Sequence, residues 1–231
     1  LHSFPTRRSS DLIKKIILTA SGGPFRTFSL KQMENVTVKD ALNHPNWSMG
    51  AKITIDSSTM MNKGLEYIEA KWLFGVDTNV EVIVHAQSII HSMIEFVDTS
   101  IMAQLGIPDM RVPIAYALTY PDRFESELPS LDLATMGNLT FEAPDVERFP
   151  CLQLAMDAMD MGQTLPTVLN AANEVAVQAF LDELIPYKDI AEIIRMVMHN
   201  HRPVPLQEIQ DVLDADLWAR EETTKLITVT H

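Results

Sequence analysis

The stretch "DSSTMMNKGLEYIEAKWLFG", residues 56–75, concentrates side chains that can do chemistry. Within ten residues, Ser57, Asn62, Lys63 and Glu66 supply a hydroxyl, an amide, an ammonium and a carboxylate. The first three are hydrogen-bond donors that suit a phosphate. A carboxylate is an oxygen ligand for a hard divalent cation. The stretch therefore predicts a phosphate-binding site with one metal-ligating carboxylate.

The surrounding pattern predicts a strand-to-helix junction that brings these groups together. "KITID" (Lys52–Asp56) alternates as a strand, and helical spacing follows over about 60–74. Asn62 and Glu66 are four residues apart, so they share one face of that helix. Helix N-termini that follow strands commonly bind ligands in α/β proteins. The alternative is a solvated helix face whose N-terminus is capped by the hydroxyls of 57–59.

A second candidate anion site lies near the start of the chain. "IKKIILTA" (Ile13–Ala20) predicts a buried strand, which runs into the glycine-rich turn "SGGPF" (Ser21–Phe25). Such a turn exposes backbone N–H groups that can bind an anion. His44, His85 and His91 follow in the same half of the chain, and each, taken alone, is more typical of a packed or hydrogen-bonded core histidine than of a catalytic one.

Composition excludes several classes of protein. The net charge of −13 argues against nucleic-acid binding, which needs a basic surface. No apolar run is long enough to span a membrane. With a single cysteine, Cys151, no disulfide can form within the chain. The 231 residues suffice for one large domain or two small ones with a real core.

The order of predicted elements gives the fold class. We expect an α/β (α+β) catalytic domain with a mixed sheet, followed by a C-terminal helical bundle. Strands are predicted at 13–20, 80–86 and 89–98, the last pairing with 100–106 as a hairpin, and helices at 151–162, 165–183, 187–201 and 205–226. The predicted boundaries are a catalytic domain at 13–120, a linker at 121–148 and a helical domain at 149–231.

Residues 1–12, "LHSFPTRRSSDL", do not match the chain that follows. They hold a proline, three serines and two arginines without periodicity. They resemble an in-frame translation of a sequencing adapter, so we expect them to be non-native. On this interpretation native sequence before Ile13 is missing. The alternative is a native N-terminal segment.

Several stretches together resemble one enzyme family. "LTASGGPFR", "HPNWSMGAKITIDSSTMMNKGLEYIEAKWLF", "HAQSIIHSMIEF", "AQLGIPDMRVPIAYAL" and "LNAANEVAVQAFL" are similar to 1-deoxy-D-xylulose 5-phosphate reductoisomerase. The resemblance runs from Ile13 to about Leu226. It implies a homodimeric oxidoreductase of the non-mevalonate isoprenoid pathway, which uses NADPH and Mg²⁺ or Mn²⁺. It also implies a cytoplasmic bacterial enzyme, with a plastid location as the alternative.

The resemblance assigns a phosphosugar substrate and the residues that bind it. The substrate is 1-deoxy-D-xylulose 5-phosphate (DXP), which becomes 2-C-methyl-D-erythritol 4-phosphate. The residues that match those holding its phosphate in the family are Ser21, His44, Ser57, Asn62 and Lys63. Their hydroxyl, imidazole, amide and ammonium groups suit that ligand.

The same resemblance assigns the remaining roles. Trp47 would cover the substrate carbon chain as a lid that excludes water. Met49 and Gly50 would lie near the nicotinamide. Glu66 would bind the metal, which chelates the substrate oxygens as a Lewis acid, and would therefore be catalytic. His91, Pro108 and Met110 match family segments near the pocket and rank second.

Two departures from the family pattern bear on activity. The other two metal carboxylates of the family lie in an Asp-Ser-Glu stretch before the SGGPF turn, and the present sequence has none there. The family's NADPH-binding Rossmann domain also precedes that stretch and does not occur in the sequence. We therefore expect this chain to be a fragment that is inactive alone. The alternatives are a non-catalytic phosphosugar-binding module and another metal-dependent sugar-phosphate enzyme.

Overall fold

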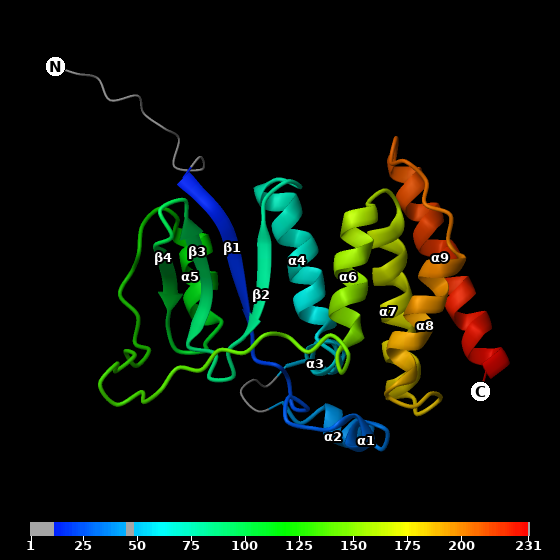
Figure 1. Ribbon diagram of the computed structural model, residues 1–231, viewed down its shortest axis with the longest axis horizontal. Helices are drawn as coiled ribbons and strands as arrows, with labels where there is room; N and C mark the ends of the chain where they lie inside the picture. The colour runs from blue at the N-terminus through cyan, green and yellow to red at the C-terminus, as the bar shows by residue number, and fades with distance from the viewer. Residues whose placement is uncertain (1–11, 45–48, 231) are drawn as a thin grey trace. The chain divides into compact units, whose positions relative to one another are not determined.

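A computed structural model describes residues 12–44 and 49–230, with the side chain of the last of these left out (Figure 1). The chain divides into two compact units, which are described separately. The sheet unit holds the chain up to Ser21 together with Asn79–Ala143. The helical unit holds Gly22–Thr78 and the chain from Pro144 onward.

A mixed sheet forms the sheet unit. Within the described residues it has four strands in the order β2-β1-β3-β4. Their bounds are Ile13–Ala20 for β1, Val80–Val84 for β2, Ile90–Phe96 for β3 and Ile101–Leu105 for β4. Strand β1 pairs in parallel with β2, whereas β3 is antiparallel to both β1 and β4. The predicted mixed sheet and the predicted β3–β4 hairpin are confirmed.

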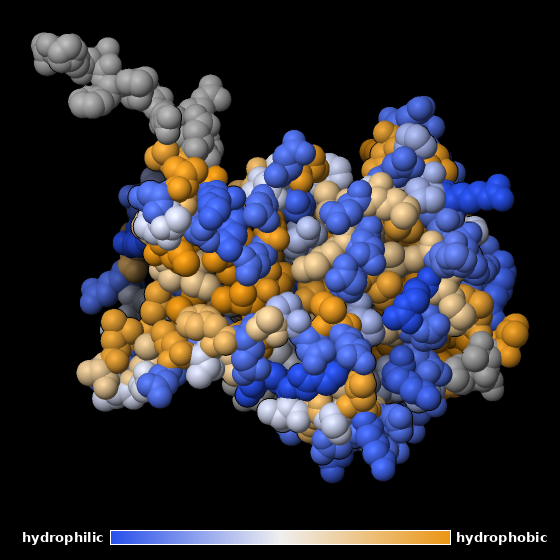
Figure 2. Space-filling model, in the orientation of Figure 1, coloured by the Kyte–Doolittle hydropathy of each residue, from blue (hydrophilic) through white to orange (hydrophobic). Residues whose placement is uncertain are grey.

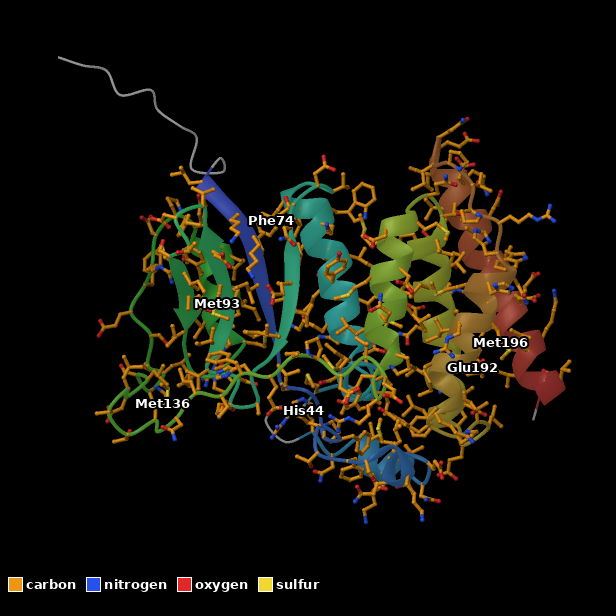
Figure 3. The ribbon with its side chains drawn as sticks, viewed as in Figure 1. His44, Phe74, Met93, Met136, Glu192 and Met196 are labelled. Atoms are coloured by element: carbon orange, nitrogen blue, oxygen red, sulfur yellow. The ribbon has the colours of Figure 1, made fainter. Side chains whose placement is uncertain are left out.

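A small cluster of apolar side chains lies on one face of the sheet. Ile17, Ile90 and Met93 are buried there, and Ile83 and Leu139 pack against them (Figure 3). Ile17 pairs with Met93, and Ile83 lies two residues beyond the β2 partner of Ile17, so these three side chains share a face. Ile90 is three residues from Met93 and joins the cluster through the irregular register between Ile90 and Ser92.

The far edge of the sheet is open. All five residues of β4 are exposed, and helix α5 (Arg111–Thr119) buries none of its residues. Met102 on β4 is 66% exposed and Leu118 on α5 is 82% exposed. Figure 2 shows apolar residues on the surface of this unit. An edge strand with apolar side chains and unpaired backbone groups is a template for pairing with another chain.

Helices make up the other unit. They are α1 (Leu30–Met33), α2 (Val38–Ala41), α3 (Ala51–Ser58), α4 (Met61–Phe74), α6 (Pro150–Met161), α7 (Leu165–Leu181), α8 (Asp189–Asn200) and α9 (Ile209–Thr230). The last four confirm the predicted helical segments. Helix α7 contacts α3, α6, α8 and α9, and its many buried alanines allow these neighbours to approach closely. Among the described residues, no helix is long and apolar enough to cross a membrane.

Helices α4 and α6 pack against each other at a glycine. A Cβ atom added to Gly64 would lie 2.5 Å from the Cβ of Ala155, which is closer than two non-bonded carbon atoms can approach. Both residues are buried, so neither helix can relax into solvent. The glycine in "NKGLE" therefore has a packing role beside the chemical groups that flank it.

One predicted element is wrong. Lys52–Asp56 forms part of helix α3 rather than a strand. The alternation of Ile53 and Ile55 and their β-branched side chains favoured a strand. In the folded chain Thr54, Ile55 and Ser58 are buried at helical spacing, and packing against α4 and α7 overrides the local preference.

The predicted hydroxyl cap of helix α4 is confirmed at Thr59, whose Oγ1 accepts from the Met61 amide at 3.3 Å. The helix begins after Met60, whose φ of 61° is in the left-handed region and whose own side chain makes no capping hydrogen bond. A left-handed residue reverses the chain direction between two helices that are only two residues apart. Ser57 therefore lies in the last turn of α3, not at the end of a strand.

The compact units divide the chain differently from the predicted domains. Residues 22–78 group with the C-terminal helices, because α4 packs on α6 and α3 packs on α7. The predicted linker at 121–148 is largely irregular and exposed up to the isolated bridge between Glu142 and Val84. The boundaries at 13–120, 121–148 and 149–231, and the non-native origin of 1–12, stay predictions.

Replacing Gly64 with alanine should destabilise the helical unit. The added methyl group collides with Ala155, which costs about 1–3 kcal/mol and exceeds the gain of about 1 kcal/mol in helix propensity. We expect a net loss of up to about 2 kcal/mol in the free energy of unfolding, measured by urea denaturation. The double variant Gly64→Ala/Ala155→Gly restores the space. Its loss in free energy of unfolding should therefore be smaller than the sum of the losses in the two single variants. Strict additivity would contradict the proposed collision.

A candidate phosphate site with one carboxylate

The junction between α3 and α4 positions the chemical groups of the opening stretch. Ser57 is half-buried in the last turn of α3, and its carbonyl accepts from the Met60 amide at 3.3 Å. Asn62 and Lys63 follow in the first turn of α4, which is the N-terminal end of a 14-residue helix. This end of a helix carries amide groups without intrahelical acceptors and a partial positive charge, which together favour an anion.

The glycine-rich turn approaches the same junction. Gly23 has a φ of +66°, and a Cβ atom there would lie 2.7 Å from the carbonyl oxygen of Ser57 and 3.0 Å from Cα of Ser58. Only glycine combines that backbone angle with so close a contact. The geometry thus explains why the SGGPF turn has a glycine at position 23, where the backbone is left-handed and no side chain fits against α3.

Asn62, Lys63 and Glu66 form one hydrogen-bonded cluster on α4. Asn62 Nδ2 donates to Glu66 Oε1 at 2.7 Å, and Lys63 Nζ donates to Glu66 Oε2. The Lys63 side chain is only 12% exposed, whereas that of Glu66 is 38% exposed. The carboxylate therefore orients both donors and still faces solvent. The predicted sharing of a face by Asn62 and Glu66 is confirmed.

His44, Met49 and Gly50 belong to the same unit. His44 follows α2 and is half-buried, and this burial lowers its pKa below the usual histidine value (Figure 3). The imidazole is then mainly neutral near pH 7. Met49 is half-buried, and Gly50 is the exposed N-cap residue of α3, whose carbonyl accepts from Thr54. The roles predicted for these three residues stay predictions.

Trp47, the predicted lid, lies outside the described residues. Four other candidates, Ser21, His91, Pro108 and Met110, belong to the sheet unit rather than to the helical unit. Ser21 ends the sheet unit and directly precedes Gly22 in the chain.

The second-rank residues of the sheet unit have local partners. Both ring nitrogens of His91 are engaged, Nδ1 with Gln104 Oε1 at 3.0 Å and Nε2 with the Ser88 carbonyl at 3.1 Å. Pro108 is half-buried and Met110 is exposed at the start of α5. The hydrogen bonds of His91 are those of a structural histidine that fixes the β3–β4 hairpin.

Within the described residues, no group of three or more histidine, cysteine, aspartate or glutamate side chains is placed to hold a metal ion. Glu66 is a single carboxylate whose two oxygens accept from Asn62 and Lys63. The described residues therefore do not make a complete cation site, and we derive no metal-dependent step from them.

The sequence-based reasoning missed a buried network behind Ser57. Asn173 on α7 donates to Asp56 Oδ1 at 2.9 Å, and Lys52 Nζ lies 2.6 Å from Asp56 Oδ2. Asp56 and Asn173 are both buried, and burial raises the pKa of Asp56 despite these partners. Asn173 lies in "LNAANEVAVQAFL", but helical spacing alone gave no reason to pair it with residue 56. The network fixes the last turn of α3, which carries Ser57.

Two family profiles match this chain. A family profile described as "DXP reductoisomerase C-terminal domain" matches residues 105–222, which is just over half of the chain. A second, "1-deoxy-D-xylulose 5-phosphate reductoisomerase C-terminal domain", matches residues 2–74. The chain belongs to the 1-deoxy-D-xylulose 5-phosphate reductoisomerase family.

Individual reductoisomerases agree with this assignment. The chain is 59% identical over 216 residues to the enzyme of Acetivibrio thermocellus, covering 93% of this chain and 57% of the relative. It is 58% identical over 216 residues to the enzyme of Geobacter metallireducens, covering 93% and 56%. The chain thus spans a little over half the length of the curated relatives it matches.

Solved reductoisomerase structures share the fold. The enzyme from Zymomonas mobilis in complex with NADPH superposes with a TM-score of 0.87 at 48% identity, covering 97% of this chain and 58% of the other. A reductoisomerase in complex with NADPH, fosmidomycin and magnesium gives a TM-score of 0.88 at 46% identity, covering 97% and 57%. The resemblance and the predicted α/β fold class are confirmed.

Replacing Asn173 with alanine should destabilise the reductoisomerase chain in a pH-dependent manner. The change removes a donor to the buried Asp56 carboxylate, which costs about 1–3 kcal/mol at pH 7. Asn173 favours the ionised form of Asp56, so its loss raises the Asp56 pKa further in the folded state. The folded-state pKa of Asp56 lies above its ordinary value of 3.8. As the pH falls through that folded-state pKa, Asp56 becomes protonated, and the stability lost by Asn173→Ala should become smaller.

Urea denaturation at several pH values checks this expectation. Asn170→Ala is the matched control, because Asn170 lies on the same helix and donates to Glu174 at 3.3 Å near the surface. The control should change stability by less than 1 kcal/mol at any of these pH values. An equal loss in both variants, independent of pH, would contradict the role of the Asp56 carboxylate.

Proposed function

We propose that this chain supplies the substrate-binding part of a 1-deoxy-D-xylulose 5-phosphate reductoisomerase. The reaction is the NADPH-dependent rearrangement and reduction of DXP to 2-C-methyl-D-erythritol 4-phosphate, in the non-mevalonate route to isoprenoids. The observation that carries the proposal is the Asn62–Lys63–Glu66 cluster at the N-terminus of α4. Membership of the family supplies the identity of the reaction.

The phosphate of DXP would bind at the α3–α4 junction. Lys63 keeps an ammonium group almost out of solvent, where its attraction for a phosphate is less screened than at the surface. Ser57 and Asn62 add a hydroxyl and an amide, and the neutral imidazole of His44 adds one N–H donor. Ser21 completes the set that the family resemblance assigns.

Glu66 would serve the reacting end of the substrate. Its carboxylate is the more exposed partner of the cluster, so it can accept an additional ligand while holding Lys63. The magnesium and NADPH in the related structures support a divalent cation and a nicotinamide as cofactors of the whole enzyme. Such a cation, Mg²⁺ or Mn²⁺, supplies Lewis acidity toward substrate oxygens. The remaining cation ligands would come from outside the described residues.

The chain alone is expected to bind DXP but not to convert it. A phosphate pocket with one carboxylate lacks most of the groups needed for hydride transfer. The competing hypothesis is a phosphosugar-binding module without any redox role. The two differ in whether the chain becomes part of a functional reductoisomerase.

The affinity for DXP tests the pocket. Lys63→Ala should weaken DXP binding to the full 231-residue chain about ten- to hundredfold, because a charge-assisted hydrogen bond to phosphate is lost. Isothermal titration calorimetry measures the change. Lys71→Ala is the matched control, since Lys71 lies at the other end of α4 and binds the Val76 carbonyl. Equal affinities of the two variants would contradict the assignment.

A separate assay tests the reaction. The chain is mixed with DXP, NADPH and Mg²⁺, and NADPH absorbance is followed. We expect no oxidation by this chain, and turnover by the same sequence joined to a family Rossmann domain that supplies the two further carboxylates. Glu66→Gln in the joined protein should abolish turnover while DXP binding persists. A joined protein that binds DXP but never oxidises NADPH would favour the binding-module hypothesis.

We infer that the chain forms a homodimer through the open edge of the sheet unit, in the bacterial cytoplasm. The exposed β4 strand and the exposed α5 helix support this partner. A second copy would pair with the edge backbone groups of β4 and cover the apolar side chains of both elements. The bacterial origin of the relatives supports the location.

A charge on the edge strand should dissociate the dimer. Met102→Lys places an ammonium group in the proposed interface, and we expect the dimer dissociation constant to rise at least about tenfold. Sedimentation equilibrium measures it. Leu73→Lys is the control, because Leu73 is also exposed, at 77% against 66% for Met102, but lies on α4 of the helical unit. A wild-type monomer, or a dimer weakened equally by both changes, would contradict the interface.

A further inference from the structure

The SGGPF turn depends on distant parts of the chain for its conformation. Gly22 and Gly23 have φ angles of 80° and 66°, and a segment without helix or strand, residues 24–29, follows before the chain enters the short helix α1 (Figure 1). A turn that binds an anion must keep its backbone in one conformation. Contacts made by the segment that follows the turn therefore bear on ligand binding.

Arg148, in the loop before α6, makes two of these contacts. Its Nη1 donates to the backbone carbonyls of Arg26 and Phe28 at 2.8 Å each, across 122 and 120 residues of sequence. The Arg148 side chain is only 24% exposed, so water competes for these hydrogen bonds less than it would at the surface. One guanidinium group thus joins the segment after the turn to the loop before α6.

Asp145 orients that guanidinium group. Its Oδ2 accepts from Arg148 Nε at 2.7 Å, and its Oδ1 accepts from the Arg148 backbone amide at 3.0 Å. These hydrogen bonds hold the pKa of Asp145 below its ordinary value, so the carboxylate is ionised near pH 7. A lysine could not reproduce the arrangement, because an ammonium group lacks the planar fork that meets a carboxylate and two carbonyls at fixed angles.

Phe25 fixes the same segment through its side chain. The ring is buried, and its centroid lies 5.1 Å from that of Phe28 and 5.2 Å from that of Tyr187, which precedes α8. On the other side of Pro24, Gly23 packs against the backbone of Ser57. The turn thus lies between the last turn of α3 and a segment that Arg148 and Phe25 hold in place.

These contacts reach the candidate phosphate site through the backbone. Ser21 directly precedes Gly22, Gly23 packs on Ser57, and both serines belong to the predicted phosphate-binding set. We propose that Arg148 is a positioning residue for the substrate phosphate, which fixes the SGGPF turn against α3 without contacting the ligand. The inference rests on the proposed function, since it requires DXP to bind through its phosphate. Without the two carbonyl contacts the turn samples other conformations, and ordering it again on binding lowers the affinity.

Arg148→Lys in the full 231-residue chain tests the proposal. The affinity for DXP, measured by isothermal titration calorimetry, should fall about five- to thirtyfold, the range expected when two hydrogen bonds are lost. Inorganic phosphate is the second probe, and the Gly23 amide signal is followed by NMR. Its titration midpoint should move to higher phosphate concentration in the variant. Asp145→Asn keeps the guanidinium group and should shift both values in the same direction by a smaller factor, which provides a test if the lysine variant does not fold.

Arg220→Lys is the matched control for general destabilisation. Arg220 is also a partly buried arginine with several hydrogen bonds, but these join α9 to Glu174 on α7 and to Asp216 on α9 itself. This variant should unfold at lower urea concentration and keep the wild-type affinity for both probes. Unchanged affinity in the Arg148 and Asp145 variants, or an equal loss in Arg148→Lys and Arg220→Lys, would overturn the positioning role and leave the phosphate pocket intact. A wild-type chain that binds neither DXP nor phosphate would overturn both.

Discussion

The hydrogen bond from Asn173 to Asp56 ties the last turn of α3 to the central helix of the helical unit. Removing a carboxylate from water is unfavourable unless it is paired, and here Lys52 and Asn173 occupy one oxygen each. The position of Ser57 follows from that pairing, because Ser57 is the next residue along a rigid helix. The left-handed Met60 then sets where α4 begins, and with it the places of Asn62 and Lys63.

Close packing imposes a second constraint on the same segment. Gly64 lies between the phosphate-type donors and Glu66, and it touches α6 so closely that no side chain fits. Gly23 meets the opposite side of the junction, against the backbone of Ser57. Each glycine is required by geometry, whereas Asn62, Lys63 and Glu66 are held by hydrogen bonds to one another. This explains why the motif mixes two kinds of residue over so short a distance.

Much of the fold could be predicted from the sequence. The hairpin of β3 and β4 and the four C-terminal helices follow from periodicity and turn residues, which are local properties. Lys52–Asp56 could not be predicted, because its helical state depends on contacts with α4 and α7 that are distant in the sequence. For the candidate site, spacing alone placed Asn62 and Glu66 on one face, but the roles of Ser21 and His44 came only from the family resemblance. The Asp56–Asn173 pair spans 117 residues and leaves no local trace.

The single cysteine of the chain is buried at the start of α6, the helix that packs against α4. A thiol in that place cannot react with a reagent until the surrounding helices separate. The rate at which Cys151 is modified under native conditions therefore reports the opening rate of the helical unit, or the population of its open state when reclosing is fast. Cys151 therefore allows the opening of the packed helices to be measured on the native chain without any added label.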